Sequence, residues 1–484
     1  AQDLYNFLFE ACNIIRGPVS QDNFKDYITP LLYYKRISDV YDEETEEALI
    51  SSGGDKEYAS LPEQHRFVIP DGCHWQEVRE RTENFGAAIV GAMRQIEIAN
   101  PDTLYGVLSM FSSQKWTNKA ILNDSKIRDL IEHLSKRKLG NKDYPADLMG
   151  DAYEILLKKF ADDSKAQAGE FYTPRSVVRL LVHILDPQPG ETVYDPACGS
   201  GGMLIEAIRY MHDDSLCCGS IFGQEKNVVN AAIAKMNLFL HGASDFNVMQ
   251  GDTLRDPKIL QGGNIAKFDC VIANPPFSLE NWGATEWSSD KYKRNIYGTP
   301  SDSCGDYAWI QHMICSMVSG QGRMAVVMPQ GILFRNQETE IRKQLVESDL
   351  IEAVVTLGDK LFYGTGLSPC FLIIRRMKPA HHSGRILMID GSKILTQKRA
   401  QNILEENDID RLYSLYQNYS DEEDYSRIVT LQEIRDKEYN LSPNRYVVYH
   451  KEEIRPYAEV LAEFKHAYEE VKRLEEEFSL LINA

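Results

Sequence analysis

The sequence predicts an α/β protein in which a mainly parallel sheet carries helices on both faces. Residues 1 to 145 hold apolar side chains at three- and four-residue spacing, which is typical of buried helix faces. From about residue 147, short apolar runs alternate with helical segments, a pattern that favours a parallel sheet. A last run of regularly spaced apolar residues predicts a long amphipathic helix near the C-terminus. We therefore expect a helical region, then a layered sheet, then one long helix.

The helical region is clearest between residues 20 and 50. Its apolar side chains recur every three or four positions, at Phe24, Tyr27, Ile28, Leu31, Leu32, Ile37 and Tyr41. This spacing places them along one face of a helix, which we expect to be buried. Pro30 lies inside the segment and is expected to kink it. Similar patterns at 83–100 and 125–137 predict further helices.

Seven short apolar runs predict the strands of the sheet. They are ETVYD (191–195), SIFGQE (220–225), NVMQGD (247–252), FDCVIA (268–273), RMAVVM (323–328), LIEAVVTL (350–357) and CFLIIRR (370–376). Helix-like segments alternate with these runs, so the strands are expected to run mainly parallel. A turn-rich loop joins the last two runs, which indicates an antiparallel strand at that end. Beyond residues 378–384 the pattern weakens.

The composition is ordinary for a folded protein, because 43% of the 484 residues are hydrophobic and 26% are charged. The formal net charge is -19. Such a chain binds a polyanion poorly unless a local basic surface or a basic partner supplies positive charge. Lys291, Lys293 and Arg294 could meet phosphates, although three basic residues are more often part of a solvated loop.

The nine cysteines include no CxxC pair, and their odd number argues against a disulfide framework or a structural zinc site. We therefore expect a reducing cytoplasm. No apolar run approaches the roughly 18 residues that span a bilayer, so no membrane association is expected. His381 and His382 are adjacent but lack a cluster of further ligands, so we expect a solvated loop there and no metal site.

The stretch ETVYDPACGSGGML, residues 191–204, runs from a strand through a glycine-rich loop into a helix. Glycine lets the backbone turn tightly and approach a ligand, and the helix start offers free N–H groups. A plain strand-to-helix turn explains the same residues. A dinucleotide fingerprint would need glycine where Leu204 stands, and the chain has no GxxxxGKS or GxxxxGKT loop. NAD and ATP are therefore disfavoured.

Two carboxylates end the next two predicted strands, because SIFGQE finishes on Glu225 and NVMQGD on Asp252. The carboxyl ends of parallel strands line one edge of a sheet, so both are expected beside the glycine loop. Glu225 can accept hydrogen bonds from both ribose hydroxyls, and Asp252 can accept one from an adenine amino group. Each carboxylate alone is explained by a solvated surface. Together with the loop they predict a pocket for an adenosine group without phosphates.

The fourth predicted strand ends at Asn274-Pro275-Pro276-Phe277, which is also a strong turn signal. The two prolines fix φ and lack N–H groups, so the Pro275 carbonyl is rigid and meets no competing local donor. This carbonyl and the Asn274 side-chain oxygen can accept both hydrogens of an exocyclic amine, which favours a pyramidal, nucleophilic nitrogen. A neutral amide avoids burying a charge. Phe277 offers a flat face for a base that has left its helix.

Two further segments flank these motifs. In GEFYTP, residues 169–174, Thr173 is a good helix N-cap and Pro174 a good first helical residue. That helix start could face a cofactor carboxylate, or it could be a cap and nothing more. In LFYGTGLSPCFLII, residues 361–374, Phe362 or Tyr363 could contact the other face of a target base, although aromatic residues before a glycine turn are commonly packing residues.

DPACGSGG, Glu225, Asp252 and NPPF resemble the motifs of S-adenosylmethionine-dependent amino-methyltransferases, and FYTP ahead of them matches the gamma order of DNA amino-methyltransferases. With the helical front, the FYGTG loop and the terminal helix, nearly the whole chain resembles the modification subunit of type I restriction-modification systems. The resemblance implies a Rossmann-like class I methyltransferase sheet and methylation of adenine N6 in DNA.

The resemblance also implies roles for residues. The catalytic set is Asn274, Pro275, Pro276 and Phe277. The cofactor is S-adenosylmethionine, bound by Phe171, Tyr172, Thr173, Asp195, Ala197, Gly199, Ser200, Gly201, Gly202, Glu225, Asp252, Thr253 and Asn274. The glycine loop is expected to hold its methionine part. Phe277, Phe362 and Tyr363 are candidates for contact with the target base.

Residues 377–484, which follow the last predicted strand, are too few for two DNA target-recognition domains. The resemblance implies a separate specificity subunit that binds two modification subunits, a restriction subunit in the full complex, and double-stranded DNA as substrate. We predict a helical domain at 1–145, a catalytic domain at 146–400 and a docking segment at 401–484. The terminal helix could dock on its own body or on another chain through Leu461, Phe464, Tyr468, Val471, Leu474, Phe478 and Leu481.

Two other functions fit part of these observations. A glutamine side-chain methyltransferase could use NPPF to grip a planar amide, and a compact monomer that needs no DNA would favour it. A cofactor-binding scaffold without catalysis could keep the glycine loop. In that case Asn274 could be changed without consequence.

Overall fold

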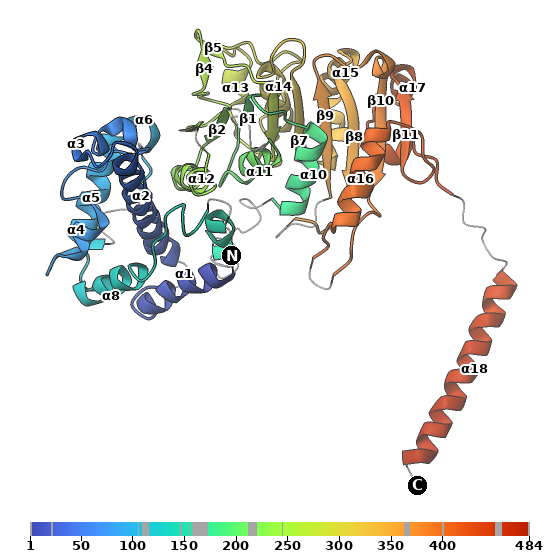
Figure 1. The fold of residues 1–484 in the computed structure, drawn as a ribbon. Helices are drawn as coiled ribbons and strands as arrows, with labels where there is room; N and C mark the ends of the chain where they lie inside the picture. Colours follow the sequence, from blue (N-terminus) through green and yellow to red (C-terminus); the bar gives the residue numbers. More distant parts are fainter. Residues whose placement is uncertain are drawn as a thin grey trace.

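The computed structural model confirms the predicted fold class: a sheet lies between layers of helices, and a helical N-terminal region stands beside it (Figure 1). The structure describes residues 2–20, 23–104, 106–108, 116–145, 148–153, 155–156, 173–211, 220–243, 245–362, 368–398, 401–450 and 457–482.

The N-terminal region is helical, as its apolar periodicity predicts. Its helices are α1 (Gln2–Ile15), α2 (Phe24–Ser51), α3 (Lys56–Ala59), η2 (Pro62–Gln64), α4 (Trp75–Arg79), α5 (Phe85–Ala99), α6 (Pro101–Leu104) and α8 (Asp124–Leu134). The predicted buried face of α2 is confirmed, because Phe24, Ile28 and Leu32 are at most 3% exposed. Pro30 lies inside this unbroken helix.

All seven predicted strands are present. The sheet contains β1 (Val193–Asp195), β2 (Ile221–Glu225), β3 (Phe246–Gln250), β6 (Cys270–Ala273), β7 (Arg323–Pro329), β8 (Ile351–Leu357), β9 (Pro369–Arg375), β10 (Arg385–Gly391) and β11 (Ser426–Thr430). Their order is β11-β10-β8-β9-β7-β6-β1-β2-β3. The predicted antiparallel strand is β9, which inserts between β7 and β8. A separate hairpin joins β4 (Leu260–Gln261) to β5 (Asn264–Ile265).

The sheet continues beyond the part that the sequence pattern predicts. Strand β10 pairs in parallel with β8, and β11 pairs antiparallel with β10. Both were missed because the alternation of helices and strands weakens after residue 384. Strand β11 lies beyond residue 400, so the C-terminal segment contributes to the same sheet. The predicted division into three domains remains a prediction.

Helices cover both faces of the sheet and bury two separate cores. One core packs against α10 (Arg175–Leu185), α11 (Gly202–Met211), α12 (Val228–Leu240) and α16 (Glu406–Asn418). The other packs against α13 (Ala284–Trp287), α14 (Asp306–Cys315), α15 (Thr339–Glu347) and α17 (Leu431–Asp436). Successive residues of β6 alternate between them, because Cys270 and Ile272 join the first core and Val271 and Ala273 the second. Because the side chains of β6 alternate in this way, the residues that follow the strand are directed toward defined faces of the sheet.

Helix α12 joins the N-terminal helices to the sheet. Its Ala234 and Leu238 pack in the core of the sheet, whereas Phe239 on another face lies in the core of the N-terminal helices. The Phe239 ring stands 5.1 Å from the ring of Tyr33 and 5.0 Å from that of Phe67, centroid to centroid. Both regions therefore share this helix as common packing surface.

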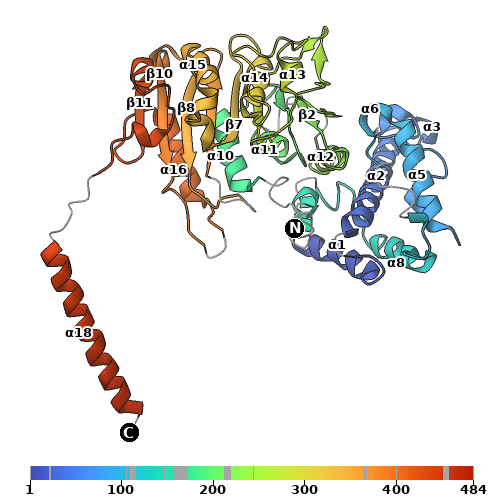
Figure 2. The ribbon, with the colours of Figure 1, turned by 180° about the vertical axis from the view of Figure 1, so that it is seen from behind.

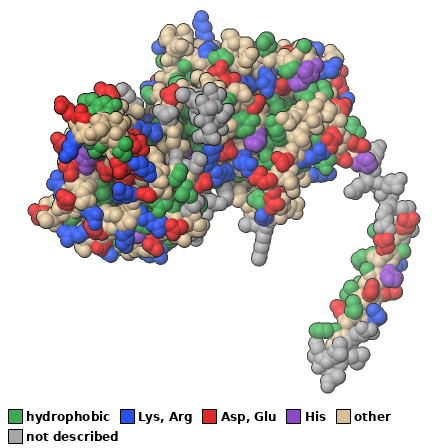
Figure 3. All heavy atoms as spheres, viewed as in Figure 1, with side chains coloured by type: hydrophobic (Ala, Val, Ile, Leu, Met, Phe, Trp, Pro, Cys, Tyr) green, Lys and Arg blue, Asp and Glu red, His purple; other side chains and the backbone are tan. Residues whose placement is uncertain are grey.

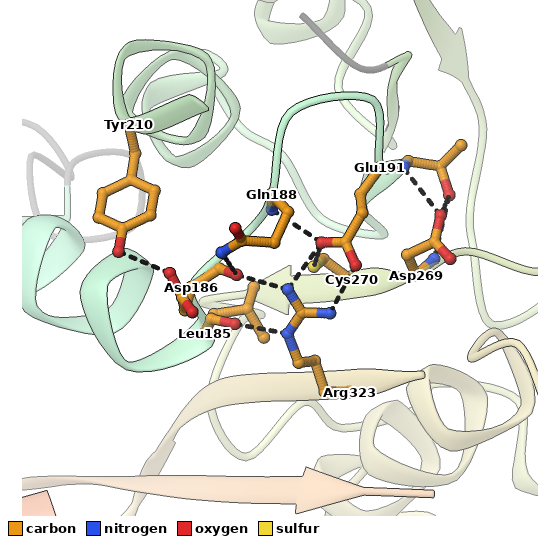
Figure 4. A network of polar contacts seen from close by, with 9 residues as sticks. Leu185, Asp186, Gln188, Glu191, Tyr210, Asp269, Cys270 and Arg323 are labelled. Atoms are coloured by element: carbon orange, nitrogen blue, oxygen red, sulfur yellow. Dashed lines mark hydrogen bonds and ion pairs between the residues drawn. The ribbon is translucent and has the colours of Figure 1, made fainter. Parts of the chain in front are cut away.

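Arg323, at the start of β7, connects the end of α10 to the segment that leads into β1 (Figure 4). Its Nε donates to the Leu185 carbonyl at 2.6 Å, and its two terminal nitrogens meet the Glu191 carboxylate at 3.0 and 2.7 Å. Burial alone would raise the pKa of Glu191, but the Arg323 guanidinium holds it below its usual value. This buried pair fixes the end of α10 against the start of β1.

The C-terminal helix α18 (Tyr457–Ile482) stands clear of the rest of the molecule in two opposite views (Figures 1 and 2). Its apolar side chains lie open along its length among acidic ones (Figure 3). The exposed apolar residues are Val460, Phe464, Tyr468, Val471, Leu474 and Phe478. Among the helices that the structure describes, none combines the length and apolar character needed to cross a membrane.

Candidate active site

The glycine loop connects β1 to α11 at the carboxyl edge of the sheet. Gly199 and Gly201 have φ of 53° and 85°, a left-handed backbone that glycine adopts without the penalty of a side chain. The Gly201 N–H donates to the Cys198 carbonyl at 2.7 Å, and the Cys198 N–H donates to the Gln224 carbonyl at 3.1 Å. The loop is thus folded back on itself and anchored to β2.

Glu225, at the end of β2, braces this loop from the neighbouring strand. One carboxylate oxygen accepts from the Gly199 N–H at 3.0 Å, and the other accepts from the Asn227 N–H at 2.7 Å. The Asn227 side chain in turn caps α12 by accepting from two backbone N–H groups. Burial raises the pKa of Glu225, and these backbone donors oppose that rise. Glu225 therefore couples the glycine loop to the start of α12.

A pocket opens between the glycine loop, the start of α10 and the end of β6. Its lining contains predicted site residues from all three segments, namely Thr173, Asp195, Ala197, Gly199, Ser200, Gly202 and Asn274. It also contains Val178, Cys198 and Met203, which sequence reasoning did not select. Cys198 and Met203 stand inside the glycine motif itself, and Val178 lies one turn into the helix that follows FYTP. Their positions within or beside the predicted motifs are the sequence signal that could have selected them.

Gly201, Glu225, Asp252 and Thr253 are not part of that lining. Asp252 forms an ion pair with Lys226 at 2.8 Å and accepts from the backbone N–H groups of Leu254 and Arg255 at 3.2 Å each. The Thr253 hydroxyl donates to the Pro196 carbonyl at 2.6 Å. These residues fix the loop after β3 to the loop after β1, at the edge of the sheet where β2 and β3 end.

Asn274 follows β6 and meets Thr173 across the pocket. Its Nδ2 donates to the Thr173 hydroxyl oxygen at 2.8 Å, whereas its Oδ1 is buried and has no hydrogen-bond partner among the described residues. We expected Thr173 to cap the following helix, but that expectation is wrong. Helix α10 begins at Arg175, its N-cap position is Pro174, and no side chain caps it. Tertiary contact with Asn274 takes the hydroxyl instead.

Asp195 ends β1 at the base of the pocket and is 2% exposed. Its Oδ1 accepts from the Ala197 N–H at 2.9 Å. Burial raises the pKa of Asp195 to about 8, and the nearby Glu225 carboxylate adds to the rise. A cation placed beside Asp195 would reverse that shift. The carboxylate therefore suits a positively charged group of a ligand.

The other predicted residues of the NPPF motif are not part of the pocket lining. Pro275 is buried, Pro276 is exposed and Phe277 is partly buried. The rings of Phe277 and Phe362 stand 6.4 Å apart, centroid to centroid, at an angle of 56°. Phe362 is 5% exposed, so little of its ring is open to a base in this arrangement. The predicted site residues Phe171, Tyr172 and Tyr363 lie outside the described residues.

Two expectations about basic side chains need correction. Arg294 does not belong to a solvated or phosphate-binding surface, because it is 1% exposed and donates to the carbonyls of Thr253 and Leu254 at 2.8 and 2.7 Å. Lys291 and Lys293 are exposed as expected. His382 is buried rather than solvated, with its ring stacked on Tyr419. In both cases a residue type that usually faces water finds polar or aromatic partners that only the folded chain provides.

The described residues contain no group of three or more His, Cys, Asp or Glu side chains arranged to hold a metal ion.

The strand order, the glycine loop after β1 and the Asn-Pro-Pro-Phe sequence after β6 define a class I methyltransferase. The chain is a member of the N-6 DNA methylase family, whose model matches residues 144–454, and of the methylase subunits of type I restriction enzymes. Residues 4–134 match the HsdM N-terminal domain. The predicted family, the predicted fold and the predicted activity as a DNA-modifying methylase subunit are thus confirmed.

Curated relatives support the assignment across most of the chain. The chain is 35% identical over 471 residues to the type I restriction enzyme MjaVII methylase subunit of Methanocaldococcus jannaschii, with 92% of this chain and 78% of that protein covered. It is 31% identical to the HindI methylase subunit of Haemophilus influenzae, with 72% and 76% covered.

A solved structure agrees as well. The type I restriction-modification methyltransferase subunit from Streptococcus thermophilus superposes with a TM-score of 0.78 at 26% identity, covering 93% of this chain and 100% of that one.

Proposed function

We propose that this subunit transfers a methyl group from S-adenosylmethionine to N6 of adenine in double-stranded DNA. The observation that carries the proposal is the Asn274 amide. Its nitrogen donates to Thr173, and its oxygen is a buried acceptor at the pocket wall that no described residue pairs with. A buried acceptor left unpaired costs free energy, which a ligand donor would recover. One hydrogen of an adenine amino group supplies that donor.

The residues of the pocket fit S-adenosylmethionine. The left-handed glycine backbone around Gly199 and Gly201 leaves the loop without bulk, and the buried Asp195 carboxylate suits a cationic ligand. Glu225 and Asp252 stand at the ends of β2 and β3, where they would accept hydrogen bonds from the ribose hydroxyls and the adenine amino group. When bound, the cofactor supplies an electrophilic methyl carbon on a positively charged sulfur.

The chain's own residues then prepare the amine. Asn274 Oδ1 and the Pro275 carbonyl accept its two hydrogens, which turns its lone pair away from the ring and toward the methyl carbon. The nitrogen forms the new bond as the carbon–sulfur bond breaks, and the surplus proton leaves to water once the nitrogen carries positive charge. The motif therefore needs neutral acceptors rather than a strong base. Phe277 provides the stacking face for the flipped base.

We also propose that the subunit works in a complex. A net charge of -19 makes unaided binding to DNA unfavourable, so a specificity subunit would bring the chain to its site. The open apolar side of α18 suits packing against helices of that subunit, and two modification subunits would bind each specificity subunit. A restriction subunit completes the full assembly. The free cysteines among the described residues agree with a reducing cytoplasm as its compartment.

The direct test is transfer of a labelled methyl group to DNA, with and without the specificity subunit. We expect transfer only in the complex, and we expect Asn274→Ala to abolish it. Asn247→Ala is the matched control, because Asn247 is an exposed asparagine on β3. Equal transfer by Asn274→Ala and the parent would contradict the role given to Asn274, and absence of transfer by the assembled complex would favour an idle scaffold. Transfer to a glutamine-containing protein without DNA would favour the glutamine methyltransferase.

A further inference from the structure

A buried acidic residue outside the predicted motifs, Asp306, binds the backbone of the loop that follows NPPF. Ser278 directly follows Phe277, is exposed, and has a φ of 50°, a left-handed conformation that is uncommon for residues other than glycine. Its N–H donates to Asp306 Oδ1 at 2.7 Å. Asp306 begins α14 and is 0% exposed. An interior carboxylate thus binds the backbone at the point where the loop turns.

That turn divides the loop between the two faces of the sheet. Phe277 packs against the core on the side of α10 and α11, where the pocket lies. Leu279 packs against the core on the side of α14 and α15. Ser278 is the single residue between them, so its backbone conformation decides whether Phe277 stays on the side of the pocket.

The segment after Ser278 is docked on the turn that precedes α14. The Gly305 N–H donates to the Leu279 carbonyl at 3.0 Å, and the Asn281 N–H donates to the Asp302 carbonyl at 2.9 Å. The Trp282 side chain covers Gly305 so closely that a Cβ there would lie 2.9 Å from Trp282 Cγ. Asp306 therefore acts on a segment whose far end is already fixed.

The charge of Asp306 is balanced inside the protein. Arg335, on the segment after β7, forms an ion pair with Asp306 Oδ2, and the Cys304 thiol donates to the same oxygen at 3.3 Å. Arg335 Nε also lies 3.0 Å from Glu338 Oε2. Arg335 thus pairs with both carboxylates, and Asp306 offers the Ser278 N–H an acceptor that is held in place by its own ion pair.

We propose that Asp306, with Arg335 as its counterion, is a positioning residue for methyl transfer: it locks Ser278 in the left-handed conformation that holds Phe277 and the Pro275 carbonyl toward the target base. The inference rests on the proposed function. Asp306 is not part of the pocket lining, so it acts on the rate of transfer and on the capture of the flipped base rather than on cofactor binding.

The sharpest test changes the exposed partner, where folding is least at risk. Ser278→Pro removes the N–H donor and forces a negative φ, whereas Ser278→Gly keeps the donor and accepts a positive φ. In the complex with the specificity subunit and DNA, we expect the proline variant to lower the single-turnover transfer rate about 100-fold, because small misplacements of reacting groups have effects of that size. The glycine variant should keep the parent rate, and both should bind S-adenosylmethionine as the parent does.

Changes at residue 306 complete the test. Asp306→Ala should lose the same activity, and Asp306→Asn should recover part of it because the amide oxygen still accepts from the Ser278 N–H. Glu352→Ala is the matched control, since Glu352 is an equally buried carboxylate paired with Arg375 far from the site. Fluorescence of 2-aminopurine at the target position should report less base flipping in the proline and alanine variants but not in the control.

Failure of this inference can be separated from failure of the proposed function. If the unaltered complex methylates DNA and Ser278→Pro does so equally fast, Asp306 has no positioning role and only this inference is overturned. A parallel loss of cofactor affinity and rate in Ser278→Pro would also overturn it, because a general collapse of the site would then explain both. If the unaltered complex transfers no methyl group, the proposed function fails first.

Discussion

The side-chain nitrogen of Asn274 donates a hydrogen bond to the hydroxyl of Thr173 at 2.8 Å, across 101 positions of sequence. This contact joins the FYTP segment ahead of the glycine loop to the NPPF segment after β6. Because the nitrogen is engaged and no described residue pairs with the amide oxygen, that oxygen is the atom left for a ligand. Thr173 therefore holds the Asn274 amide in this orientation.

We predict that Thr173→Val slows methyl transfer about tenfold, since valine has the same shape without the acceptor, and one hydrogen bond is worth roughly 1 kcal/mol. The freed amide can then rotate and offer its nitrogen to the base. Thr173→Ser retains the hydroxyl and should retain the rate. Single-turnover transfer at saturating cofactor checks this, and equal rates for the valine and serine variants would contradict it.

We predict that cofactor binding releases a proton below pH 8 and that affinity rises with pH up to that point. Free Asp195 has a pKa of about 8, so it is protonated at neutral pH, and a cationic ligand favours its ionised form. Affinity should rise by up to about tenfold per pH unit below 8. Calorimetry in buffers of different ionisation enthalpy measures the released proton. In Asp195→Asn this release should vanish; its persistence would exclude Asp195 as the source.

Asp195 is also expected to lower the stability of the free protein at high pH while it strengthens cofactor binding. The folded-state pKa of Asp195 lies above the ordinary value of 3.8, so its contribution to stability is complete below about pH 4 and is lost as pH rises through about 8. Asp195→Asn cannot ionise and should unfold at higher temperature than the parent at pH 8, while it binds cofactor less tightly. Thermal unfolding without ligand at pH 5 and pH 8 measures the difference, and an unchanged gap between the two proteins would argue against it.

We predict that Arg323→Met destabilises the subunit by roughly 3 kcal/mol, because it leaves the Glu191 carboxylate without its buried partner. Arg323 holds the pKa of Glu191 below its usual value, so the stability from this pair is present above about pH 4.5 and is lost as pH falls further. The deficit of the variant should therefore shrink in acid. Denaturant unfolding at pH 7 and pH 4 checks both points, with Arg411→Met as a control on a more exposed ion pair.

We predict that Phe464→Glu in α18 prevents assembly with the specificity subunit while cofactor binding is unchanged. Phe464 is 66% exposed here and lies within the apolar series of the helix. Loss of a central aromatic anchor typically weakens an interface by about 2 kcal/mol or more. Lys465→Glu introduces the same residue one position away, outside that series, and should assemble normally. Analytical ultracentrifugation distinguishes them, and assembly by both variants would point to another docking surface.

Local sequence signals determined much of this protein by themselves. Apolar periodicity located helices of the N-terminal region and seven of the nine strands of the sheet, because burial of one face requires a fixed spacing in each type of element. The glycine motif and NPPF identified the segments of the site, since glycine and proline restrict the backbone wherever they stand. Strands β10 and β11 escaped prediction, because the alternation of helices and strands weakens after residue 384, although both strands join the same sheet.

Only the tertiary structure decided how polar side chains are used. Thr173 serves Asn274 rather than a helix end, Arg294 is buried on carbonyls of the loop after β3, and Asp306 reaches the backbone of Ser278. Each of these partners is distant in sequence, so no local spacing pattern predicts the contact. The physical reason is that the periodicity of apolar residues indicates which positions are buried. The hydrogen-bond partner of a polar side chain depends instead on which distant segment the fold places beside it.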